Sequence, residues 1–192
     1  MKIIGLSGKM KSGKTTVAEY LERELDCDVL VYGFADSVRV LMYEFFGEVG
    51  RTMDDYKSQS VKEEKHVSGK TNRQMLQEIG RKMREIWPDV WIHNWREWVK
   101  GYECTVIVPD VRFPNEVKAI QDLGGIVIRL TRDPVDSDDE TETALDDVQR
   151  LHGLSYCEYG RPYKFDHLID NATMSIDETN EAVLKIVKEY LA

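Results

Sequence analysis

The sequence predicts an α/β fold in which helices flank a five-stranded parallel sheet. Five apolar runs have the length of buried strands, at residues 2–7, 29–34, 104–109, 125–130 and 165–170. Six stretches with helical periodicity lie between and after them, at residues 14–25, 37–47, 71–84, 89–99, 115–123 and 177–191. Because strands that alternate with helices pair in parallel and are covered on both faces, this order of elements predicts three layers.

A glycine-rich segment connects the first strand to the first helix. Residues 8–15, Gly-Lys-Met-Lys-Ser-Gly-Lys-Thr, fit the pattern G-x-x-x-x-G-K-[ST]. The glycines let backbone N–H groups point inward, and together with the positive end of the helix these groups hold a phosphate. Lys14 would reach the β- and γ-phosphate oxygens, and Thr15 a Mg²⁺ ion. The loop indicates a P-loop NTPase. We expect Lys11 to contact a phosphate, whereas the role of Lys9 stays open.

The length of 192 residues suits a single domain with a substantial core. We expect one domain over 1–192, with an inserted helical subregion at about 48–103 and a lid at about 132–161. The insertion is far longer than a parallel crossover requires, so it could cover a substrate. The second segment contains the acidic run 133–140, which is typical of a solvated lid or of disorder without function.

Charge and composition indicate which classes of molecule the protein can bind. The net charge of −9 opposes binding to nucleic acid polymers. No apolar run approaches the length of a membrane span, and no signal peptide is visible. Cys27, Cys104 and Cys157 lack the spacing of metal ligands or of a disulfide framework, which favours free thiols in a reducing compartment. We therefore expect a cytoplasmic protein whose partners are small molecules, with neither nucleic acid nor membrane among them.

Tryptophans gather in one predicted helix. Trp91, Trp95 and Trp98 fall at helical spacing, which predicts a packed helix face, with stacking on a nucleotide base as the alternative. The aromatic residues of 87–102 could also form the face of a homodimer, and periodicity does not separate that face from a core.

Carboxylates follow two of the predicted strands. In open α/β sheets ligands gather beyond the carboxyl ends of the strands, so residues at these positions are candidates for function. Asp110 could hold Mg²⁺ directly or through its waters, or it could cap the helix that follows. Asp36 could cap the helix that begins near Ser37, or it could orient a substrate or a metal-bound water. Both alternatives stay open for each residue.

Arginines are abundant where a second phosphorylated molecule would bind. Transfer between two phosphorylated molecules brings polyanions together, and fixed guanidinium groups offset their repulsion. Candidates in the insertion are Arg73, Arg81 and Arg84, and those near strand ends are Arg39, Arg112, Arg129 and Arg132. Arg73 and Arg84 lie about three helical turns apart, so they can share one helix face.

Longer phrases carry a resemblance to a known family. They are Gly8–Thr16, Phe34-Ala35-Asp36, Arg73–Gly80, Pro109-Asp110-Val111-Arg112-Phe113-Pro114-Asn115-Glu116 and Gly124–Leu130. In these phrases the chain resembles the phage deoxynucleoside monophosphate kinases, a branch of the P-loop nucleotide kinases. The resemblance implies a nucleoside monophosphate kinase-like fold. It also implies transfer of the ATP γ-phosphoryl group to a deoxynucleoside 5′-monophosphate (dNMP), with Mg²⁺, to give ADP and the diphosphate.

The resemblance also implies roles for individual residues. Lys14, Arg112 and Arg132 would be catalytic, with Arg132 approaching the ATP phosphates from the lid. Residues that would bind those phosphates are Lys11, Ser12, Gly13, Lys14, Thr15 and Thr16. Thr15 would hold Mg²⁺, with Asp110 contributing through water, and Asn171 would lie beside the adenine. Residues that would bind the dNMP are Asp36, Arg39, Arg73, Arg84, Asp110 and Arg112.

One phrase of the lid departs from the family. Glu142-Thr143-Ala144-Leu145 is similar to the family's Ser-Glu-Thr-Ala-Leu phrase, but Thr141 stands in place of the serine, and the histidine that often precedes the phrase is absent.

Two other functions fit the same loop. Another P-loop small-molecule kinase, acting on phosphomevalonate or dephospho-coenzyme A, would share the loop and the aspartate at position 36. A hydroxyl acceptor would then give Asp36 a base role. A P-loop ATPase or switch without a second substrate is a different class, and the N-K-x-D signature of GTP specificity is absent.

Overall fold

The computed structural model describes residues 1–47, 50–134, 140–145, 155–156 and 162–192. The chain divides into two compact units, one made of residues 1–33 and 101–192 and the other of residues 34–100. The expected lid at 132–161 lies largely outside the described residues, as does Cys157, whereas Cys27 and Cys104 are free thiols.

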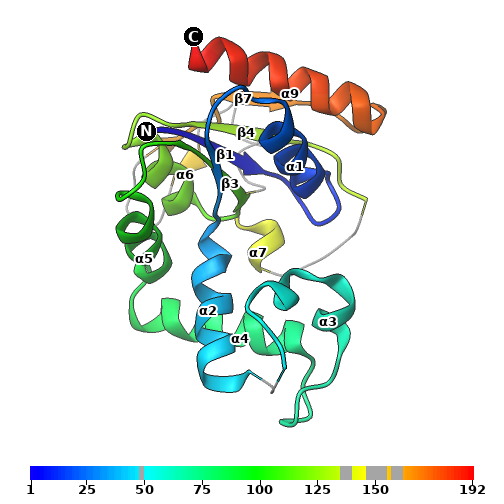
Figure 1. Ribbon diagram of the computed structural model, residues 1–192, viewed down its shortest axis with the longest axis vertical. Coiled ribbons are helices and arrows are strands. Elements are labelled where there is room, and N and C mark those ends of the chain that lie inside the picture. Colours follow the sequence, from blue (N-terminus) through cyan, green and yellow to red (C-terminus); the bar gives the residue numbers. More distant parts are fainter. Residues whose placement is uncertain (48–49, 135–139, 146–154, 157–161) are drawn as a thin grey trace. The chain divides into compact units, whose positions relative to one another are not determined.

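The first unit contains the predicted parallel sheet (Figure 1). Its strands are β1 (Lys2–Ser7), β2 (Val29–Val31), β3 (Thr105–Val111), β4 (Ile126–Leu130) and β7 (His167–Ile169). They lie in the order β2-β3-β1-β4-β7, and every adjacent pair is parallel. The predicted five-stranded sheet is thereby confirmed, with β1 at its centre.

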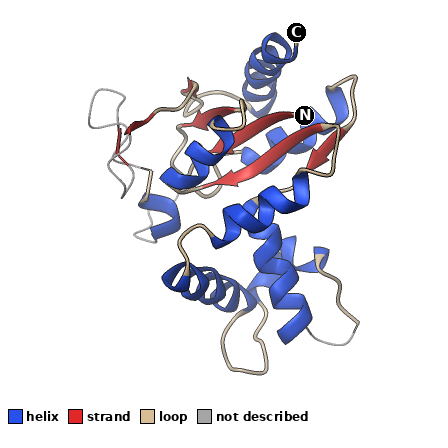
Figure 2. Ribbon diagram, turned by 90° about the vertical axis from the view of Figure 1, so that its left-hand side faces the viewer, coloured by secondary structure: helices blue, strands red, loops and turns tan. Residues whose placement is uncertain are grey.

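Helices cover both faces of this sheet (Figure 2). They are α1 (Lys14–Glu24), α6 (Pro114–Gln121) and α9 (Ile176–Leu191). Ile4 and Leu6 of β1 belong to the core that includes apolar side chains of α1 and α9. The opposite face of β1 meets α6, since a Cβ on Gly5 would lie 2.8 Å from Cδ1 of Ile120. Successive residues of β1 thus face different helices, as strand pleating requires.

Two strand ends differ from the prediction. The second strand ends at Val31, and helix α2 begins at Phe34, because the apolar run continues from the strand into the buried face of the helix. The third strand continues to Val111, which pairs with Ser7 after a register shift in β1. Asp110 therefore lies inside β3, not after it.

Helices make up the second unit. They are α2 (Phe34–Phe46), the 3₁₀ turn η1 (Asp54–Lys57), α3 (Gln59–Glu63), α4 (Asn72–Ile86) and α5 (Val90–Val99). Trp91 and Trp95 are buried; Trp95 packs against Phe34 with ring centroids 5.0 Å apart, and Nε1 of Trp91 donates to the carbonyl of Gly80. The packed helix face is confirmed for these two tryptophans. Trp98 is 48% exposed and lies outside that face, and the homodimer stays a prediction.

The remaining described elements are short. They are α7 (Glu140–Thr143) and a two-stranded antiparallel pair, β5 (Ser155–Tyr156) with β6 (Pro162–Tyr163). Elements of this length, like η1 and α3, are too short for hydrophobic periodicity to predict. None of the helices within the described ranges is long and apolar enough to cross a membrane.

Candidate phosphate-binding site

The glycine-rich loop between β1 and α1 is the centre of the candidate site. Gly13 is the N-cap of α1 with φ of 106°, and no side chain caps the first turn. Gly8 has φ of 153°, and a Cβ there would lie 2.9 Å from the carbonyl oxygen of Leu130. A side chain would be strained at both positions, because positive φ is favourable only for glycine. The two glycines of the motif therefore adopt backbone conformations that other residues disfavour, as predicted, and these conformations curl the loop into a phosphate cradle.

Lys14 folds back over this cradle. Its Nζ donates to the carbonyl oxygens of Gly8 at 2.6 Å and Lys9 at 2.7 Å, and the residue is only 8% exposed. Burial lowers the pKa of Lys14 from 10.5 to about 7, and the nearby Arg112 contributes to the shift. An anion bound beside the amine would offset both effects, so the site favours polyanionic ligands.

Four other charged side chains influence Lys14. Arg112 and Arg129 oppose its protonation, while Glu142 and Asp110 favour it. Glu142 of α7 accepts from the backbone N–H of Met10 at 2.6 Å and forms an ion pair with Arg112. The structure thus brings the predicted residues Lys14, Arg112 and Asp110 into one cluster beside the loop.

Arg129 is a further member of this cluster; it is one of the candidate arginines near strand ends, but no specific role was predicted for it. It is 5% exposed, its Nη1 donates to Oγ of Ser7 at 3.0 Å, and its guanidinium lies 5.6 Å from the ring centroid of Phe165. The sequence does contain a signal for its place in the site. An arginine within the apolar run Ile-Val-Ile-Arg-Leu is costly to bury unless its charge is paired, so its presence there indicates a buried partner or ligand. Ser7 in turn donates to the carbonyl of Val111 at 3.0 Å, so Arg129 links the carboxyl ends of β1, β3 and β4.

Asp110 is packed against the end of the second strand. A Cβ on Gly33 would lie 2.3 Å from its Oδ1, so only glycine fits there. The helix-capping alternative for Asp110 is wrong, because α6 begins at Pro114 with Phe113 as its N-cap. Instead, Oε2 of Glu116 accepts hydrogen bonds from the backbone N–H groups of Arg112 and Phe113.

Asn171 connects Arg132 to the glycine-rich loop. Nδ2 of Asn171 donates to the carbonyl of Ser12 at 3.0 Å, and its Oδ1 accepts from the N–H of Arg132. The guanidinium of Arg132 donates to the carbonyls of Asn171 and Met174. Asn171 is fully buried, so in this structure it positions the loop. The nearby Lys9 forms an exposed ion pair with Asp133 at 2.6 Å.

The second unit holds the other predicted residues. Asp36 lies within the first turn of α2, so the alternative in which it caps this helix is wrong. Its carboxylate pairs with Arg39 at 2.5 Å and lies 3.8 Å from Nζ of Lys57, a cation that sequence reasoning missed. In α4, Arg73 pairs with Glu63 at 2.9 Å, and Arg84 lies on the same helix, as predicted.

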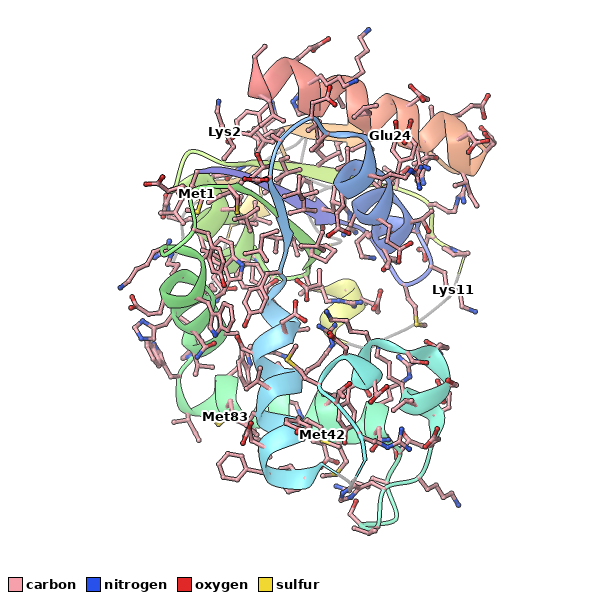
Figure 3. The ribbon with its side chains drawn as sticks, in the orientation of Figure 1. Met1, Lys2, Lys11, Glu24, Met42 and Met83 are labelled. Atoms are coloured by element: carbon pink, nitrogen blue, oxygen red, sulfur yellow. The ribbon has the colours of Figure 1, made fainter. Side chains whose placement is uncertain are left out.

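Exposed residues complete the loop. Thr15 and Thr16 are exposed at the start of α1, and Lys11 is exposed with its side chain pointing away from the sheet (Figure 3). No cluster of three His, Cys, Asp or Glu side chains that could hold a metal is found within the described ranges. A hydroxyl such as that of Thr15 and a carboxylate such as Asp110 suit Mg²⁺, which is bound by few protein oxygens when a substrate phosphate supplies the others.

Lys11 carries backbone strain that can be relieved. Its φ of 62° is the only positive value among the described non-glycine residues. We expect Lys11→Gly to raise the free energy of unfolding by about 0.5–1 kcal/mol in the absence of ligand, measured by urea denaturation. Lys11→Ala is the matched control, since it removes the charge but keeps the Cβ. Equal stabilisation by both variants would assign the effect to charge and contradict the strain argument.

Comparison with known proteins places the chain in a family. None of the protein-family models matches the chain. A protein of Acanthamoeba polyphaga mimivirus, described as "Putative deoxynucleotide monophosphate kinase", is 32% identical over 158 residues, which cover 72% of this chain and 78% of that protein.

Solved structures of other kinases are also similar in part. The dephospho-CoA kinase of Campylobacter jejuni has a TM-score of 0.48 at 15% identity, with 98% of this chain and 97% of that one covered. The shikimate kinase of Aquifex aeolicus has a TM-score of 0.44 at 14% identity, with 97% and 96% covered. The assignment depends on the viral relative, whose identity and coverage are sufficient: the chain belongs to the deoxynucleotide monophosphate kinase family.

Proposed function

We propose that the protein transfers the γ-phosphoryl group of ATP to a dNMP, with Mg²⁺, to give ADP and the deoxynucleoside diphosphate. The observation that carries the proposal is the cluster at the glycine-rich loop, in which Glu142 joins the partly buried Arg112 to the N–H of Met10, close to the buried Lys14. An additional arginine beside the cradle suits a reaction in which a second phosphate approaches the first.

The chemistry needs charge neutralisation more than a base. An acceptor phosphate is mostly dianionic at neutral pH, since its second pKa is about 6, and it can attack without losing a proton. Lys14 would hold the β- and γ-oxygens of ATP with the N–H groups of residues 11–16, and Arg132 would approach them from the lid. Mg²⁺ would be held by Thr15, with Asp110 acting through water, and would offset phosphate charge.

The resemblance to the kinase family gives the residues that would bind the acceptor. Arg112, Arg73 and Arg84 would hold its phosphate, and the other residues assigned to the dNMP are Asp36, Arg39 and Asp110. Arg73 would leave its ion pair with Glu63 and bind the phosphate. Breaking that pair would cost little, because ion pairs at the surface contribute little stability. Asn171, whose amide supports the loop, would lie on the adenine side of ATP.

A coupled assay of ADP formation tests this proposal. We expect ATP consumption to accelerate with at least one dNMP and not with phosphomevalonate or dephospho-coenzyme A, which are the acceptors of the alternative kinases. Steady ATP hydrolysis that no acceptor accelerates would support an ATPase and refute the kinase. Lys14→Met, assayed in parallel, identifies contaminating activity.

The buried amine also predicts a proton linkage. With the pKa of Lys14 at about 7, the free protein has largely lost this proton at pH 8, and bound ATP should restore it. We expect uptake approaching one proton per ATP at pH 8 and little uptake at pH 6. Calorimetry in buffers of different ionisation enthalpy measures it. Lys14→Arg is the control, because arginine stays protonated throughout; persistent uptake in this variant would show that another group is responsible.

A further inference from the structure

The carboxylate of Glu142 occupies groups that suit a phosphate. Its Oε2 accepts the N–H of Met10, a residue of the glycine-rich loop, at 2.6 Å, and its Oε1 pairs with Nη1 of Arg112. Its charge also favours the protonated form of Lys14. Glu142 belongs to α7, more than a hundred positions along the chain from the loop, and is buried.

A carboxylate and a phosphate are recognised by the same donors. Both present anionic oxygens that accept from loop N–H groups and from guanidinium groups. The donors around Glu142 come from the loop and from the arginine that the proposed reaction requires. We propose that Glu142 is an internal ligand of the phosphate cradle, which the terminal phosphates of ATP must displace before they can bind.

Electrostatics explain why such a ligand is present. Lys14, Arg112 and Arg129 are buried or partly buried cations in one cluster, and cations buried without anions are costly. Asp110 and Glu142 are the anions that act on Lys14 there. When ATP enters, its phosphates supply negative charge in excess, so the carboxylate is no longer needed and is repelled.

The competition has a measurable size. If the state with Glu142 in the cradle outnumbers the open state by about ten to one, the apparent affinity for ATP is lowered about tenfold. Displacement also releases Arg112 for the acceptor. ATP binding should therefore strengthen acceptor binding, and the acceptor should strengthen ATP binding by the same factor.

The test compares Glu142→Gln with Asp133→Asn. The first removes the charge of the internal ligand with little change in shape. The second is matched, because it removes one negative charge from an exposed ion pair with Lys9 of the same loop. We expect Glu142→Gln to bind both ATP and inorganic tripolyphosphate about tenfold more tightly than the wild type, and Asp133→Asn by less than about threefold. Affinity for ATP that is unchanged or weaker in Glu142→Gln, or a gain as large in Asp133→Asn, would overturn the proposal.

Thermal denaturation gives an independent readout. If Glu142 leaves the cradle when ATP binds, Glu142→Gln should lower the melting temperature of the free protein and change that of the ATP-saturated protein much less. An equal loss in both states would mean that the ion pair with Arg112 persists in the complex, which contradicts displacement.

The inference rests on the proposed use of ATP, and the two can fail separately. A wild-type protein that binds neither ATP nor tripolyphosphate refutes the proposed function, and the displacement of Glu142 with it. A wild-type protein that binds ATP, with a Glu142→Gln variant that binds no tighter, leaves the kinase intact and refutes only the internal ligand.

Discussion

Replacing Lys14 by methionine should lower the rate of phosphoryl transfer by at least about 10³-fold, because the variant loses the cation that stabilises developing charge on the transferred group. Methionine is similar in length and fills the buried volume that the lysine stem occupies. We therefore expect the fold to persist. The measurement is the rate of ADP formation at saturating ATP and dNMP; activity within about tenfold of the wild type would contradict the role of Lys14 in the reaction.

The same variant should change how stability depends on pH. Burial lowers the pKa of Lys14 to about 7 in the folded protein, below its ordinary value of 10.5. Between these values the unfolded chain holds a proton that the folded chain lacks, so the wild-type contribution to stability rises with pH across this window. Below pH 7 the amine is charged in both states and its burial cost is fully present. Lys14→Met should lack this rise, and its stability relative to the wild type should be greatest at pH 6.

Replacing Arg112 by alanine should damage acceptor use far more than ATP binding. The guanidinium would contact the acceptor phosphate in two places, which no other side chain reproduces. We expect kcat/KM for the dNMP to fall by about 10²-fold or more. Binding of ATP, measured by calorimetry without acceptor, should change much less. Equal loss of both affinities would show that Arg112 does not distinguish the two substrates.

Two further variants sharpen this result. Arg112→Lys keeps the charge but not the fork of donors, so it should recover ATP binding fully and acceptor use only in part. Arg23→Ala is the control for general loss of positive charge. Arg23 of α1 is exposed and pairs with its neighbour Glu24, so its removal should leave kcat/KM within about threefold of the wild type.

The fold could be predicted where local pattern and tertiary packing agree. Val17 and Leu21 repeat on one face of α1, and both are buried in the core, so the helix is where the periodicity places it. The second strand was predicted too long, because Phe34 is buried at 3% exposure whether it belongs to a strand or a helix. An apolar run shows that residues are buried and does not show where the backbone changes conformation.

The site could be predicted only where its residues are contiguous in the sequence. The glycine-rich loop is contiguous, so its spacing determines its geometry. Glu142 reaches the N–H of Met10 across 132 positions, and no periodicity records that contact. The phrase around Glu142 is similar to one of the family, with a threonine in place of its serine, but the partner of the Glu142 carboxylate follows from the tertiary fold alone.

The hydrogen bond from the side-chain amide of Asn171 has a consequence for folding during synthesis on the ribosome. It clamps the carbonyl of Ser12 across 159 positions of sequence, and β1 lies between β3 and β4, which are synthesised long after it. The loop is therefore made long before the residue that fixes it. Contacts so distant in the chain form slowly, so a nascent chain should be unable to bind ATP until Asn171 has emerged from the ribosome.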